Sequence, residues 1–223
     1  MEQYPASETL LPALEEATER IGRDFLYRVH LSLHRALGLP PLPRGAVERV
    51  YGMPIPHRTL AKARLTPEEA WSKALKRFRE LRAKGIPLRP RDIRELSSAV
   101  VDRWYALEMV EDRAKAQALR NFLAGFLRAH PRLPSRPPET VPEAVALLRL
   151  REAEAWALEW AVEHLAEHVR GLAEDTRRGV AQVLMGAVGR SDPPEAVGRQ
   201  LLDRFGTLNR DWRRIAITET ATD

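Results

Sequence analysis

Two histidines one helical turn apart are the residues of this chain best placed for metal chemistry. His164 and His168 frame the run HLAEH, which has the H-x-x-E-H arrangement of a zinc-binding helix. Histidines at i and i+4 can chelate zinc, and Glu167 between them can act as a general base. A catalytic site also needs a third ligand, for which Glu174 and Asp175 are candidates by proximity alone. We therefore expect no metal ion, and a zinc hydrolase built on His164 and His168 remains the least favoured alternative.

Other catalytic patterns are missing from the sequence. His30 and His34 repeat the i, i+4 spacing without a glutamate at the required place, so we expect them to flank an apolar stripe. The sequence holds no Gly-rich phosphate loop, G-x-S-x-G elbow or Rossmann fingerprint. Cysteine is also absent, which excludes disulfides and thiolate nucleophiles. We predict a protein that is not an enzyme and has no catalytic residue and no cofactor.

The charge balance suits contact with nucleic acid without requiring it. The chain carries 36 basic and 31 acidic residues, and 31 of the basic residues are arginine. Arginine binds phosphate oxygens well, so a helical protein that binds DNA through its arginine excess is the main alternative function. No apolar run approaches the ~20 residues of a membrane span, so we expect no membrane contact.

Apolar residues recur every three or four positions along most of the chain, as they do in amphipathic helices. This pattern predicts an all-α fold: an elongated bundle of long helices that ends in a short C-terminal helix pair. The first helix is expected from Glu8 to Leu37, with Ser7 as its N-cap and Gly38 at its end. One face of it carries Leu10, Leu14, Ala17, Ile21, Phe25, Val29 and Leu33.

Prolines divide the remaining sequence. Five of them between Pro40 and Pro56 predict an ordered connector without a long helix. Five more between Pro131 and Pro142 predict a domain boundary. We therefore expect an N-terminal helical region at 1–130, a proline-rich linker at 131–141 and a C-terminal helical region at 142–223.

Two further helices are expected before that linker. Thr66, Pro67 and Glu69 form a capping box, which predicts a helix that ends at Lys84. A third helix is expected over 91–129. Its apolar stripe consists of Ile93, Leu96, Val100, Trp104, Leu107, Val110 and Ala114.

A very long helix should open the C-terminal region. Thr140 and Glu143 repeat the capping box, and the apolar pattern continues over 142–188, with interruption expected only near Gly171 or Gly179. A short helix should follow, capped at Ser191 or Asp192, and end at Phe205 before Gly206. Asn209 is expected to cap a last helix. Leu158, Val162, Leu165, Val169, Leu172, Val180, Val183 and Ala187 form the stripe of the long helix.

The last helix carries a recognisable segment, WRRIAITETA from Trp212 to Ala221. It resembles the "R…IA-x-TE-TA" signature of tailed-phage minor head proteins of the Mu F-like head-morphogenesis family. The resemblance covers about residues 155–223, where the expected order of helices also fits. The residues of the signature that we single out, as structural or docking residues, are Trp212, Ile215, Ala216, Thr218 and Glu219.

The resemblance implies a virion protein that binds the portal or the inner capsid during head assembly and DNA packaging. Its expected partners are the portal protein and other head proteins, with non-specific double-stranded DNA and self-association into a homo-oligomer as further expectations. Its expected locations are the phage head and, during assembly, the host cytoplasm. In this family the N-terminal half varies widely. Members continue well beyond the signature, so we expect that this chain is truncated at its C-terminal end.

The helical geometry predicts a role for the signature itself. Trp212, Ile215, Ala216 and Glu219 lie at i, i+3, i+4 and i+7, so they share one face of a helix. A carboxylate on an apolar face needs a partner. We expect Glu219 to be largely buried and bonded to an arginine of the long helix or of its symmetry partner, and we expect the tryptophans to serve core or interface packing.

Overall fold

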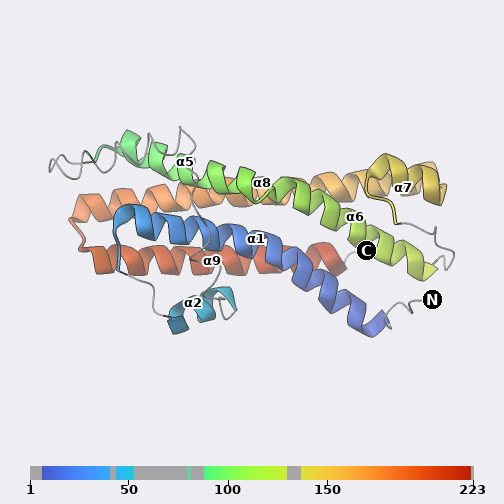
Figure 1. The fold of residues 1–223 in the computed structure, drawn as a ribbon, viewed down its shortest axis with the longest axis horizontal. Helices are drawn as coiled ribbons and strands as arrows, with labels where there is room; N and C mark the ends of the chain where they lie inside the picture. The colour runs from blue at the N-terminus through green and yellow to red at the C-terminus, as the bar shows by residue number, and fades with distance from the viewer. Residues whose placement is uncertain (1–6, 41–43, 53–79, 81–87, 130–136, 222–223) are drawn as a thin grey trace. The chain divides into compact units, whose positions relative to one another are not determined.

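The computed structural model describes residues 7–40, 44–52, 80, 88–129 and 137–221 (Figure 1). Within these ranges it contains helices and no strand, which confirms the predicted all-α class. None of the described helices is both long and apolar enough to cross a membrane. The helices are α1 (Ser7–Leu37), α2 (Arg44–Tyr51), α5 (Pro90–Leu107), α6 (Val110–Ala129), α7 (Val141–Leu148), α8 (Glu152–Arg190) and α9 (Pro194–Ala221).

The chain folds into two compact units, and each unit combines distant parts of the sequence. Three long helices, α1, α8 and α9, contribute to both, so the units do not coincide with the predicted division at 131–141, of which 131–136 lie outside the described residues. Unit 1 consists of Met1–Gly22, Met109–Leu172 and Asp211–Asp223, and unit 2 consists of Arg23–Glu108 and Ala173–Arg210.

Unit 1 has a core of apolar side chains from α6, α7, α8 and α9. Trp212 and Ala216 of α9 are wholly buried, as are Leu158 and Val169 of α8. A satellite cluster joins α6, α7 and the first turns of α8 through Leu119, Leu123, Ala144 and Leu158. One buried hydrogen bond crosses this core: the Nδ2 of Asn121 donates to the Oγ1 of Thr18 at 3.4 Å. The core therefore joins α1 to helices that follow it by a hundred residues or more.

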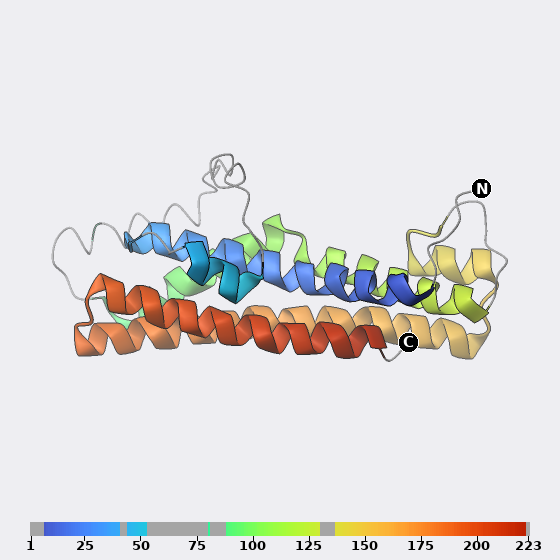
Figure 2. The ribbon, with the colours of Figure 1, turned by 90° about the horizontal axis from the view of Figure 1, so that it is seen from below.

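Unit 2 buries the second part of the predicted stripe of α1, whereas Leu10, Leu14 and Ala17, in unit 1, are half-buried. Phe25, Val29 and Leu33 are wholly buried, and Ile21, which belongs to unit 1, is only 4% exposed. In both views the second half of α8 lies beside the first half of α9 (Figures 1 and 2). Trp104 closes the core from α5, where its indole nitrogen donates to the hydroxyl oxygen of Ser32 at 2.7 Å.

Local capping chemistry sets two helix boundaries where it was expected. Gly38 adopts a φ of +61°, and the following backbone N–H, that of Leu39, donates to the carbonyl oxygen of His34 at 2.9 Å. This is the predicted glycine end of α1. Thr140 accepts a hydrogen bond from the backbone N–H of Glu143 at 3.3 Å, which confirms it as an N-cap.

The predictions of two unbroken long helices are wrong. Each helix is interrupted, and the residue at the interruption is neither glycine nor proline. The helix expected over 91–129 is interrupted at Met109, whose φ is +47°. The helix expected over 142–188 is interrupted at Arg149, whose φ is +52°. A second cap follows at once, since the carboxylate of Glu154 accepts from the backbone N–H of Arg151 at 2.8 Å. Leu107, predicted on a buried stripe, ends its helix and is 46% exposed.

The predicted C-terminal helix pair is instead a single helix, α9. It runs through Gly206, and it runs through Asn209, whose side chain does not serve as an internal N-cap. The Nδ2 of Asn209 donates to the carbonyl oxygen of Val50 in α2 at 2.8 Å, and the same Val50 packs beside Gly206. Both residues therefore make tertiary contacts, and the helix continues through them. Just before the N-terminal end of α9, the carboxylate of Asp192 accepts hydrogen bonds from Arg190 and Gln200.

Three other expectations concern the remaining segments. The proline-rich connector at 40–56 contains a short helix, α2, between its two groups of prolines. The helix expected from Thr66 to Lys84 lies outside the described residues, except for Glu80, which is helical. The long helix α8 continues through Gly171 and Gly179. At Gly179 a side chain would collide with the guanidinium of Arg204, so its absence permits a close contact between α8 and α9.

Candidate metal centre

Two histidines of α8 and one glutamate of α9 converge in unit 1. The Nε2 of His168 lies 3.2 Å from the Oε1 of Glu219, and the Nε2 of His164 lies 3.6 Å from the same oxygen. One ligand atom from each of the three residues lies within 4.8 Å of the other two. The i, i+4 spacing stacks both imidazoles on one face of α8, as expected. The third residue comes from the signature, which the sequence did not connect to these histidines.

The imidazole rings are held by aromatic contacts. The ring of Trp160 stacks on that of His164, with centroids 4.4 Å apart and planes 21° apart. His164 in turn meets His168 edge-on at 4.5 Å. The side chains of both histidines are 31% exposed and that of Glu219 is 16% exposed. The group is therefore fixed from one side and open to solvent from the other.

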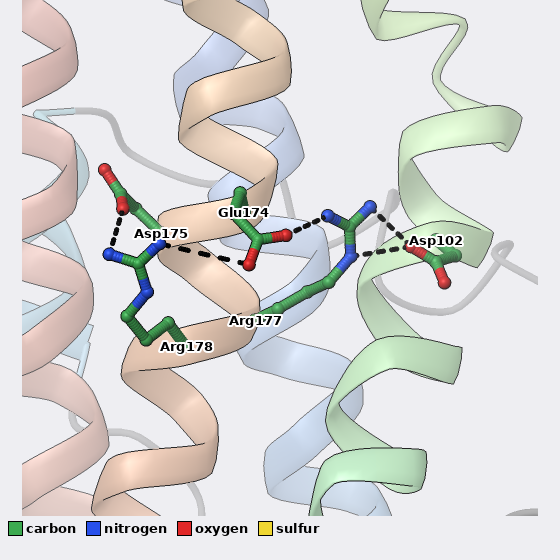
Figure 3. Close-up of polar contacts among 5 residues, drawn as sticks. All are labelled: Asp102, Glu174, Asp175, Arg177 and Arg178. Carbon is green, nitrogen blue, oxygen red and sulfur yellow. Dashed lines mark hydrogen bonds and ion pairs between the residues drawn. The ribbon is translucent and has the colours of Figure 1, made fainter.

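The two acidic residues considered as third ligands lie elsewhere, in unit 2. The carboxylate of Glu174 contacts Arg177 at 2.9 Å, and that of Asp175 contacts Arg178 at 3.6 Å (Figure 3). Arg177 also binds Asp102 of α5 at 2.6 Å. These carboxylates take part in a surface network of ion pairs, in which each acidic side chain is more than half exposed. Proximity in sequence was a wrong guide to the third residue of the cluster.

The signature face is largely as predicted. Trp212 and Ala216 are wholly buried, Ile215 and Glu219 are half-buried, and Thr218 is exposed. The indole nitrogen of Trp212 donates to the backbone carbonyl of Glu19 in α1 at 2.9 Å. Our prediction of an arginine partner for Glu219 is wrong, since its partners are His164 and His168.

The arginines nearest to Glu219 along α9 bind other carboxylates. Arg213 contacts Glu19 at 3.4 Å and Arg214 contacts Asp211 at 3.9 Å. On α8, Arg170 contacts Glu163 and donates to the carbonyl oxygen of Ala166. The side chain of Glu219 thus meets imidazole nitrogens, which can bind a metal ion, and not guanidinium groups, which cannot.

A second pair of histidines lies in unit 2, where it serves packing. His30 is wholly buried, stacks on Phe205 at 4.5 Å, and shares a 2.9 Å hydrogen bond between its Nδ1 and the hydroxyl of Tyr51. Burial, and then the neighbouring His34, hold the pKa of His30 well below its ordinary value. Burial also lowers the pKa of His34. Both imidazoles are therefore neutral near pH 7.

Two large aromatic side chains are exposed on the first half of α8. Trp156 is 67% exposed and Trp160 is 50% exposed, and they lie one helical turn apart. Leu147 of α7, in the same unit, is also exposed. Large aromatic side chains left in water at adjacent positions are typical of surfaces that bind another protein.

An apolar cavity of about 250 Å³ lies in unit 2. It is lined by residues at the C-terminal ends of α1 and α8 and at the N-terminal ends of α5 and α9. Leu37, Leu184 and Val197 line it together with Asp192. The carboxylate of Asp192 is already bound by Arg190 and Gln200, and these contacts hold its pKa below the ordinary value. Ser191 is the other polar residue of this lining, and the remaining lining residues are apolar.

Chemically, the cluster in unit 1 offers two imidazole nitrogen donors and one carboxylate oxygen donor. Such a set can hold a divalent metal ion, while Glu167, the base of the H-x-x-E-H pattern, is exposed and outside the converging group. Comparison with known proteins adds nothing to this assignment, because no family model, no curated protein and no solved structure matches the chain.

Proposed function

We propose that this chain is a head-morphogenesis protein of a tailed phage, which binds the portal protein or the inner capsid during head assembly and DNA packaging. It acts by binding and not by catalysis. The proposal rests on the resemblance of the signature, with the portal and other head proteins as partners and the virion as its final location.

The observation that supports the proposal is the role of the signature in unit 1. Trp212 and Ala216 are wholly buried in α9, and Trp212 bonds to the backbone of α1. A segment that is recognisable in sequence and forms the core of its unit is expected of a family scaffold. The partner surface then lies outside the signature.

The surface that we assign to the portal protein is the exposed pair Trp156 and Trp160 on α8. Both lie within the part of the chain that resembles the head-protein family, and their rings are the largest exposed apolar groups of the described residues. Complete burial of a tryptophan side chain removes roughly 150–250 Å² from water, and Trp156 and Trp160, at 67% and 50% exposed, still have much of that area in water. Two such rings can supply the centre of an interface.

Co-expression with a portal protein from the same genome tests the proposal. We expect the two proteins to co-elute on size exclusion, and we expect the W156A/W160A double variant to elute alone with an unchanged helical spectrum. The matched control is L107A/V188A, which removes exposed apolar side chains from unit 2 and should leave the complex intact. A complex unaffected by the tryptophan substitutions, or none with the native chain, would contradict the assignment.

The alternative of DNA binding is less well supported by the surface. Many arginines of the described residues bind carboxylates of the same chain and so are already neutralised in pairs. The pairs are Arg20–Glu16, Arg151–Glu154, Arg170–Glu163, Arg177–Asp102, Arg190–Asp192 and Arg213–Glu19. Salt distinguishes the two functions, since affinity for DNA phosphates falls steeply with salt and an apolar protein interface is little affected. DNA affinity that survives removal of Trp156 and Trp160 but is abolished by salt would favour this alternative.

A further inference from the structure

In the cluster of unit 1, the carboxylate of Glu219 lies from each histidine at the spacing of two ligands of one metal ion. Zinc binds histidine nitrogen and carboxylate oxygen at about 2.0–2.2 Å, and tetrahedral geometry then separates the ligand atoms by about 3.4 Å. The Oε1 of Glu219 lies 3.2 Å from one imidazole nitrogen and 3.6 Å from the other. These two separations match the tetrahedral value without movement of the backbone.

The surroundings of the cluster favour a bound cation. Glu219 brings a negative charge to two imidazole nitrogens, while the neighbouring Arg170 and Arg213 are bound to Glu163 and Glu19. The stacking of Trp160 on His164 fixes the orientation of one ligand ring before an ion arrives. Pre-oriented ligands bind a metal more tightly because less conformational freedom is lost.

The cluster is partly exposed, which leaves the fourth coordination position of a bound ion to water. With 31% of each histidine side chain exposed, an ion can enter from solvent, and the fourth position faces water. Two imidazoles and one carboxylate suit zinc and similar transition ions, whereas magnesium and calcium prefer oxygen ligands. The expectation of no metal, drawn from the sequence, rested on the lack of a third ligand, and Glu219 fills that role.

We propose that His164, His168 and Glu219 bind one divalent transition-metal ion, zinc in the first instance, which ties the last turn of α9 to α8 within unit 1. Glu219 is two residues from the end of α9, so the ion would hold the last turn of that helix. The site is structural, with water as the fourth ligand. Trp160 belongs both to the surface proposed for the portal protein and, through its stacking on His164, to the surroundings of this site.

Calorimetric titration of the untagged, chelator-treated full chain with ZnCl2 tests this site. We expect one zinc ion per chain, and no binding of MgCl2 under the same conditions. H164A, H168A and E219Q should each weaken zinc binding by more than the ~10–100-fold that is lost when a residue hydrogen-bonded to a metal ligand is removed. The matched control is E167Q, which alters the exposed glutamate between the histidines and should leave the affinity unchanged.

A second measurement keeps the test independent of folding defects in the variants. Because Trp160 stacks on His164, Co²⁺ in the site should quench the fluorescence of that ring. The native chain should therefore show saturable quenching that zinc reverses, and W160F should lose most of it while it still binds zinc. Zinc binding that persists in E219Q at native affinity, failure of the native chain to bind zinc, or quenching unchanged in W160F would each overturn the proposal.

Discussion

The indole nitrogen of Trp212 donates a hydrogen bond to the backbone carbonyl of Glu19, which lies 193 residues earlier in the chain. The same ring lies against Gly22, where an added Cβ would sit 2.5 Å from its atoms. One side chain of the signature therefore joins the last helix to the first within unit 1, by a polar contact and by close packing.

Replacement of Trp212 with alanine should lower the free energy of unfolding by ~3–5 kcal/mol, because it empties a fully buried ring site. Urea denaturation followed by circular dichroism measures the change. W156A is the control, since that ring is 67% exposed and its loss should alter stability by less than about 0.5 kcal/mol. Equal effects at the two positions would show that Trp212 does not belong to the core.

Substitution of Gly22 with alanine should destabilise the chain by ~1–3 kcal/mol through overpacking against Trp212. The penalty should largely disappear in a W212A background, which a double-mutant cycle detects. G171A provides the matched control in α8, because no atom lies within 4 Å of the added Cβ. Alanine there should stabilise the helix by about 0.5–1 kcal/mol. Additive effects of G22A and W212A would be inconsistent with the contact.

Acid should weaken the fold through His30. Its folded-state pKa lies below that of the unfolded chain, so between the two values the unfolded state binds more protons. The free energy of unfolding should therefore fall as pH drops below about 6.5, by up to about 1.4 kcal/mol per pH unit for this group. Urea titrations at a series of pH values measure the slope. H30Q should flatten it, and equal slopes in both proteins would contradict this role.

Removal of zinc should lower the melting temperature of the native chain if the cluster binds it. At a free zinc concentration about 100 times the dissociation constant, linkage adds about 2.7 kcal/mol to the free energy of unfolding. EDTA should remove this increment from the native chain and from E167Q. It should leave E219Q unchanged, because that variant lacks a ligand. Thermal scans with and without chelator provide the comparison.

The sequence predicted those parts of the fold whose cause is local. Gly38 ends α1 because only a residue tolerant of positive φ fits there, and Thr140 caps α7 through its own hydroxyl. The breaks at Met109 and Arg149 have no such cause, since neither side chain favours positive φ and both are exposed. Periodicity continues across both breaks, so the pattern alone predicted unbroken helices.

The candidate site was predictable to the same extent. The spacing of His164 and His168 places them on one face of α8 by helical geometry alone. The signature likewise placed Glu219 on the face of Trp212. The packing of α9 against α8 is a property of the folded core. The local sequence pattern therefore could not predict that both histidines lie beside one carboxylate oxygen of Glu219.

The contact of Gly22 with Trp212 also constrains how this sequence can change over evolutionary time. A side chain at position 22 is compatible with the fold only if the ring at position 212 becomes smaller or shifts, because both occupy the same volume. In a set of natural relatives, the two positions should therefore covary. A variable N-terminal half would then retain one small residue as long as its last helix retains the tryptophan.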